Sequence, residues 1–331
     1  MGELQGRADE PEHGDRPRHA EGGRDEATVR ARVEPRSRSE YAADLEQRAV
    51  SGREPRLFVS RLDPPADAPD GGTAGKPADR VVEPDPLLEA VRRLDPTKAG
   101  LPDIGARDGA AYVHAREKER PWLTVVRECA PEVQRVFAAL DQGGCHGHIR
   151  HEGWVTEEMN QRRVAFLEDP AQLDPVKRAA GIDGLKPGEQ PHQCRQAAGR
   201  IIDANVFAAA FARGLEHPTV YAALETPFHS DAKPSPVQIP IAELLGPDGH
   251  RYCTGWRLEP VDGSMSAARR ARDAWVVAGP AAHRASDLRE PTARPVETFE
   301  GGTVVFAFGH SSTAERYEVV TMYPRPPEPG R

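Results

Sequence analysis

The first 84 residues are too polar to form a hydrophobic core, and this limits the folded part to residues 85–331. They are charged and rich in Pro, Gly and Ala, with segments such as DPPADAPDGGTAGKPADR. A single short apolar run, RLFVSRL at 56–62, interrupts them. A segment of this composition buries too little surface to offset the entropy lost on ordering. The sequence therefore predicts a disordered arm over residues 1–84.

The overall charge excludes one class of function. The formal net charge is −8 at pH 7, whereas a nonspecific nucleic-acid coat needs a basic footprint. An acidic enzyme that holds a few phosphates in one cleft remains compatible with this charge. No apolar run reaches the length of a membrane span, and the N-terminus has no signal-peptide core. We expect cytoplasmic synthesis, with secretion by a route without a cleaved signal peptide left open.

Residues 85–140 have the pattern of a small helical module. The segment 86–94 (PLLEAVRRL) places its leucines and Val91 on one helical face. In the segment 122–140, apolar residues recur at spacings of three and four residues, as on one face of a helix. Pro131 can occupy the first turn of a second helix within this segment. A structural or partner-binding role is the simplest interpretation of this module.

Residues 141–326 predict an α+β domain. Thr156 and Asp203 are placed to cap helices, the first reaching about Leu167. Strands are expected at 237–245 and 252–258, and a surface helix at 266–278. The clearest β signal is TVVFAF at 303–308 and YEVVTMY at 317–323, which predict an antiparallel hairpin. We therefore expect helices packed on an antiparallel sheet that ends in a C-terminal hairpin, followed by a disordered tail at 327–331.

The candidate catalytic residues lie near the two ends of this domain. Residues 143–151 (GGCHGHIRH) hold His146 and His151, and imidazole suits proton transfer near neutral pH. Arg162 follows His151 by eleven residues, which is about three helical turns, so a continuous helix would place them on one face. Thr321 and Tyr323 alternate along the last strand and share a face, on which Tyr317 and Val319 are also expected. A His, an Arg and two hydroxyls in one cleft would suit a phosphotransfer site without metal.

This order of residues resembles a known family. Gly-Gly, a His, then Arg-His, an Arg eleven residues later and a final Thr-x-Tyr-Pro resemble the bacterial RNase-A-like toxin domain. That domain lies at the C-terminus of contact-dependent-inhibition (CdiA-type) and other polymorphic toxins. Over residues 141–326 the resemblance implies an RNase-A-like α+β fold and an endoribonuclease that needs no metal or cofactor. It implies the active-site residues His151, Arg162, Thr321 and Tyr323.

The resemblance also implies partners and leaves one role open. The substrate would be RNA, tRNA included, with a cognate immunity protein as partner and no part for DNA or a membrane. A second acid–base group is needed, and His146 is the nearest residue, followed by His310. The chain departs from the family where Cys145 precedes His146, where HEGW follows at 151–154, and in additions at 168–198 and 262–298.

Two other interpretations stay open. Cys145 with His148, and His192 with Cys194, are short pairs that could close a tetrahedral zinc site. Four widely spaced cysteines otherwise predict free thiols, with disulfides only in an oxidising compartment. Alternatively, the chain is a non-enzymatic effector in which 85–140 binds a partner and the domain is a degenerate relative. Ribonuclease activity in the presence of EDTA would support the endoribonuclease, and stoichiometric bound zinc would support the zinc site. Absence of both would support the non-enzymatic effector.

Overall fold

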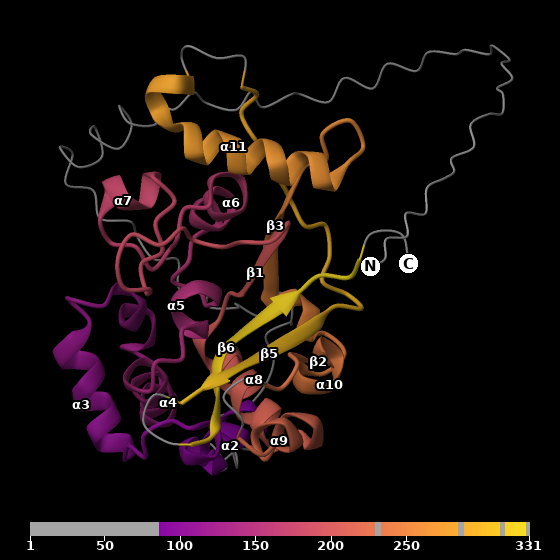
Figure 1. The fold of residues 1–331 in the computed structure, drawn as a ribbon. Helices are drawn as coiled ribbons and strands as arrows, with labels where there is room; N and C mark the ends of the chain where they lie inside the picture. Colours follow the sequence, from indigo (N-terminus) through magenta and orange to yellow (C-terminus); the bar gives the residue numbers. More distant parts are fainter. Residues whose placement is uncertain (1–85, 229–232, 284–287, 312–314, 329–331) are drawn as a thin grey trace, which may run out of the picture. The chain divides into compact units, whose positions relative to one another are not determined.

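The computed structural model describes residues 86–228, 233–283, 288–311 and 315–328 (Figure 1). The predicted arm at 1–84 and most of the predicted tail lie outside these ranges, although Arg257 Nη2 donates to the carbonyl of Pro327. The described residues all belong to one compact unit. No helix in the described part is long and apolar enough to cross a membrane.

The fold class is α+β, as the sequence predicts. Short 3-10 turns link several of the helices. The α-helices are α2 (Pro86–Arg93), α3 (Ala106–Arg116), α4 (Pro131–Gln142), α5 (Gly147–His151), α6 (Glu157–Phe166), α7 (Pro175–Ala179), α8 (Ala204–Glu216), α9 (Pro218–Leu224), α10 (Ile241–Leu245) and α11 (Met265–His283, kinked at Gly279). The strands are β1 (Ala197–Ile201), β2 (Val237–Pro240), β3 (Cys253–Leu258), β4 (Ala293–Pro295), β5 (Thr303–His310) and β6 (Tyr317–Arg325).

The strands form two small antiparallel sheets instead of one. Their orders are β1-β3-β4 and β2-β5-β6, and β5 and β6 form the predicted hairpin (Figure 1). The strand expected at 237–245 is shorter than predicted, because pairing with β5 stops at Pro240. Proline offers no N–H to a ladder, and the chain turns there into α10.

The predicted caps are present where the sequence places them. The Thr156 hydroxyl accepts a hydrogen bond from the Met159 N–H at 3.1 Å and opens α6. The Asp203 carboxylate accepts from two backbone N–H groups at the start of α8, and Pro131 occupies the first turn of α4. These caps satisfy amide groups that a helix start otherwise leaves unpaired.

Helices α2, α3 and α4 contribute side chains to the same hydrophobic core as the sheets. Phe137 of α4 packs against Phe207 of α8, with ring centroids 5.7 Å apart. One continuous cluster of buried side chains runs from α2 through α4 and α8 to Phe306 and Met322 of the hairpin. Three short helices cannot cover their own apolar faces, and α8 and the hairpin supply the missing surface.

A β-bulge sets the register of the last strand. Ala307 pairs with Thr321 and Phe308 pairs with Val319, so Val320 lies between them without a partner in β5. One extra residue reverses the side-chain alternation beyond it.

The bulge changes which side chains share a face of β6. Simple alternation groups Tyr317 and Val319 with Thr321 and Tyr323, and this grouping is wrong. Tyr317 and Val319 are buried together with Met322, which lies beyond the bulge. Thr321 and Tyr323 keep a common face, but it is the face opposite to the core.

Candidate functional site

Helix α5 lies directly against β1 and β6 because glycines permit the approach. A Cβ on Gly147 would stand 2.8 Å from the backbone nitrogen of Met322, closer than real side chains come. A Cβ on Gly199 of β1 would likewise collide with the Pro324 carbonyl of β6. The small residues therefore bring the end of α5 beside both strands.

His151 closes α5 and is held in one tautomer. Its Nδ1 lies 2.7 Å from the carbonyl oxygen of Gly199, which can only accept, so Nδ1 carries the proton. Nε2 then keeps its lone pair, and Nη1 of Arg163 lies against the ring, 3.3 Å from Nε2 and 3.5 Å from Nδ1. The ring stacks on Tyr323 with centroids 5.0 Å apart. Burial, and then the Arg163 charge, hold the pKa of His151 well below its usual value, so the residue is a neutral base.

Arg163 of α6 is a buried cation without a carboxylate partner. Its Nη1 donates to the Arg150 carbonyl at 3.0 Å, and its Nε donates to Nε2 of His192 at 3.2 Å. The residue is 6% exposed, and within the described ranges no carboxylate oxygen lies within ion-pair distance of it. An unpaired buried charge is unfavourable, and burial lowers the pKa of Arg163 accordingly. An anion bound here would relieve that cost.

Arg162, the arginine expected in the site, is directed elsewhere. Its Nε donates to Glu168 at 2.8 Å, and its guanidinium lies over the Phe166 ring. The eleven-residue spacing assumed one continuous helix, but α5 ends at His151 and α6 begins only at Glu157. The break changes the phase, and the structure places Arg163, not Arg162, against His151. The sequence does contain this residue as the second member of the Arg-Arg pair.

The two hydroxyl residues lie on the α5 side of β6. Tyr323 stacks on His151, and both Tyr323 and Thr321 are half-buried. The Thr321 Oγ1 atom is fully buried and has no hydrogen-bond partner among the described residues. A buried hydroxyl normally finds a partner, so this one is a vacant donor on the face of β6 that also carries Tyr323.

His146 lies near this group, as its backbone contact and its electrostatic neighbours show. Its N–H donates to the Val320 carbonyl at 2.9 Å, which fixes it beside the bulge and next to Thr321. Burial, followed by Arg150 and Arg163, lowers the pKa of His146 to about 3. His310 lies in a different part of the hairpin, where it packs on Phe228 and Tyr317. The structure therefore brings together His146, His151, Arg163, Thr321 and Tyr323.

The predicted zinc ligands are not gathered. His148 Nε2 lies 3.5 Å from Asp141, whereas His192 Nδ1 lies 3.4 Å from Asp183. Cys145 and Cys194 join no cluster of three or more potential ligands in the described part, and all four cysteines are free thiols.

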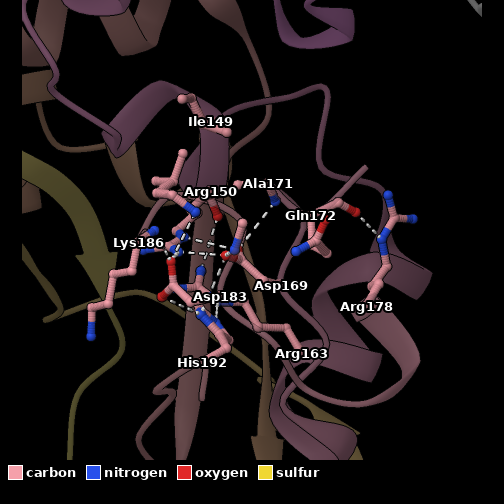
Figure 2. Close-up of polar contacts among 12 residues, drawn as sticks. Ile149, Arg150, Arg163, Asp169, Ala171, Gln172, Arg178, Asp183, Lys186 and His192 are labelled. Carbon is pink, nitrogen blue, oxygen red and sulfur yellow. Dashed lines mark hydrogen bonds and ion pairs between the residues drawn. The ribbon is translucent and has the colours of Figure 1, made fainter. Parts of the chain in front are cut away.

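A different cluster, Asp169, Asp183 and His192, has ligand atoms within 4.8 Å of one another. Arg150 already occupies this cluster. Its Nη2 lies 2.5 Å from Asp169 and 2.9 Å from Asp183, so a guanidinium supplies the positive charge there (Figure 2).

Glu152 follows His151 but belongs to another environment. Its carboxylate accepts from the Trp154 N–H at 3.1 Å, and its Oε1 is buried without a partner in the described structure. Burial raises the pKa of Glu152 to about 8, so it is largely protonated at neutral pH.

No family model, no curated protein and no solved structure matches this chain. The function is therefore inferred from the residues of the site and their geometry.

Proposed function

We propose that this protein is a metal-independent endoribonuclease that cleaves RNA by transphosphorylation through the ribose 2′-hydroxyl. The observation that carries the proposal is the contact between Arg163, a buried cation with no carboxylate at ion-pair distance in the described part of the chain, and the ring of His151, whose Nε2 is unprotonated. A phosphodiester offers the negative charge that Arg163 lacks and a hydroxyl proton for His151. The vacant Thr321 hydroxyl supplies a further donor beside them.

In the proposed reaction, the side chains of the site and the RNA itself supply every proton and every bond that is needed. His151 Nε2 takes the proton of the 2′-hydroxyl as the O2′–P bond forms. Arg163, Thr321 and Tyr323 stabilise the charge on the non-bridging oxygens. The P–O5′ bond breaks, and His146 donates a proton to O5′. The products are a 2′,3′-cyclic phosphate and a free 5′-hydroxyl.

His146 must be protonated to act as the acid. Its pKa is about 3 in the free protein, because burial and two neighbouring guanidinium groups disfavour the imidazolium. A bound phosphate adds negative charge to the same place, and negative charge raises the pKa of a histidine. Substrate binding therefore favours the protonation state that the reaction needs.

RNA is the substrate class because its own 2′-hydroxyl provides the nucleophile, so no metal-activated water is required. The chain is acidic overall, and Arg163 provides the local positive charge instead. The resemblance to RNase-A-like toxin domains supports the same activity. It extends the proposal to an RNase-A-like fold, a toxin role and a cognate immunity protein.

The test is cleavage of total RNA by the full chain in the presence of EDTA. We expect fragments ending in 2′,3′-cyclic phosphate, and a rate about 10²–10⁴ lower for His151→Ala. Circular dichroism should show that this variant remains folded. Absence of cleavage of any RNA would leave the non-enzymatic effector as the better interpretation. Activity that survives His151→Ala and disappears with EDTA would require a metal-dependent site.

A further inference from the structure

His192 lies in contact with Arg163 and is itself held in one orientation. Arg163 Nε donates to His192 Nε2 at 3.2 Å, so Nε2 is unprotonated and the ring proton is on Nδ1. Nδ1 lies 3.4 Å from Asp183 Oδ2 and 3.5 Å from Asp169 Oδ2 (Figure 2). The ring is 1% exposed. A chain of contacts therefore runs from the two carboxylates through His192 to the guanidinium.

The two carboxylates are fixed by other groups. Arg150 lies between them, and its Nε donates to Asp169 Oδ1 at 2.9 Å. Asp183 Oδ1 accepts from the backbone N–H groups of Leu185 and Lys186, at 2.9 and 3.0 Å. His192 is thus oriented by a rigid and fully paired cluster.

Arg162 and Arg163 donate to acceptors of different charge. Arg162 meets the carboxylate of Glu168, which neutralises it. Arg163 meets a neutral imidazole, which fixes the plane of the guanidinium without placing a carboxylate directly against it. A neutral acceptor is what an arginine needs if it must be both rigid and free to bind an anion.

We propose that His192, oriented by Asp183, is a positioning residue that holds Arg163 for a substrate phosphate. This rests on the proposed ribonuclease function, since Arg163 is the group that meets the phosphorane there. Nε is engaged by His192 and Nη1 by the Arg150 carbonyl, whereas Nη2 has no hydrogen-bond partner among the described residues. Holding Nε directs the Nη2 edge of the guanidinium towards the anion. Small displacements of such a group reduce catalysis strongly.

The test compares two substitutions of His192 in the full chain. His192→Gln places an amide oxygen near the position of Nε2 and can still accept from Arg163, whereas His192→Leu cannot. We expect His192→Leu to lower kcat for RNA and the affinity for inorganic phosphate, each by about 10–10²-fold. His192→Gln should stay within about threefold of wild type in both. Tyr112→Phe, which removes a hydrogen bond to Asp141 in another part of the core, is the control for loss of a buried polar contact.

The outcomes separate the two proposals. Equal losses in His192→Leu and His192→Gln, or no loss in either, would overturn the positioning role while leaving ribonuclease activity intact. Should wild type bind phosphate through Arg163 yet cleave no RNA, the proposed function fails, and the phosphate titration still decides the role of His192. If His192→Leu does not fold, Asp183→Asn replaces it, and unchanged phosphate affinity in that folded variant would contradict the proposal.

Discussion

The Thr321 hydroxyl is a buried polar group for which the described part of the free protein provides no partner. Leaving a buried hydroxyl unpaired costs about 1–3 kcal/mol. Such a cost is tolerated most easily where the missing partner is a ligand, and Thr321 lies on the same face of β6 as Tyr323, next to His151. Residues of this kind trade stability for binding.

Thr321→Val tests this trade. Valine has the same shape without the hydroxyl, so the free energy of unfolding should stay constant or rise by up to about 1 kcal/mol. RNA cleavage should fall by about 10–10²-fold, because one donor to the phosphate is lost. Chemical denaturation and initial cleavage rates measure the two effects. A variant that is less stable and equally active would show that the hydroxyl has a structural partner.

At the scale of elements, the site depends on how closely α5 approaches the strands. Gly147 faces the backbone of Met322, and no side chain fits between them. Gly147→Ala should push α5 away from β6, lowering the midpoint of thermal unfolding and reducing cleavage by at least about tenfold. Gly105→Ala is the control, because a Cβ there meets only an ordinary contact with Asp108 at 3.6 Å. Equal effects of the two substitutions would contradict this account of α5.

Elements with local signals can be predicted from the sequence, and those that depend on tertiary contacts cannot. Caps at Thr156 and Asp203 and the alternation of β5 and β6 are local, and the sequence predicts them. Strand β1 reads AAGRI, which has little β propensity, and it forms because β3 pairs with it along its whole length. The bulge at Val320 has no recognisable sequence signal, so the predicted grouping of Tyr317 and Val319 with Thr321 and Tyr323 on one face is wrong.

The site residues divide in the same way. His151, His146, Thr321 and Tyr323 can be chosen from their types and spacing, and the structure brings them together. The choice between Arg162 and Arg163 depends on the break between α5 and α6. A helical wheel assumes one continuous helix and therefore cannot predict this choice. His192 stands out in the sequence only as a possible zinc ligand, and its contact with Arg163 spans 29 residues of sequence.

At the scale of the whole molecule, buried groups with shifted pKa values predict a stability optimum. The pKa values of three buried histidines (His148, His151 and His192) and of the partly buried His146 are all lowered, with desolvation as the main cause. The unfolded chain binds protons below about pH 6.5 that the folded protein does not, so stability falls as pH decreases from about 6.5. Glu152 acts in the opposite sense, because its folded pKa is about 8 and its unfolded pKa is near 4.5. Its deprotonation in the unfolded state lowers stability as pH rises to about 8.

We therefore expect maximal stability near pH 6.5, with a decline on both sides. Each group that differs fully in protonation contributes a slope of about 1.4 kcal/mol per pH unit. Glu152→Gln should remove the decline between about pH 6.5 and 8 and leave the acidic decline unchanged. Urea denaturation at a series of pH values measures both limbs. An unchanged alkaline limb in the variant would show that Glu152 is ionised in the folded protein.

The central claim is that Arg163 and His151 form a site for a phosphate, and one pair of substitutions tests it most directly. The measurement is the rate of RNA cleavage in EDTA by Arg163→Lys and by Arg162→Lys. Lysine keeps the charge but loses the planar, two-pronged contact with phosphate. We predict that Arg163→Lys loses at least about 10²-fold, while Arg162→Lys stays within about threefold of wild type. A large loss in Arg162→Lys with an active Arg163→Lys would contradict a phosphate site at Arg163 and His151.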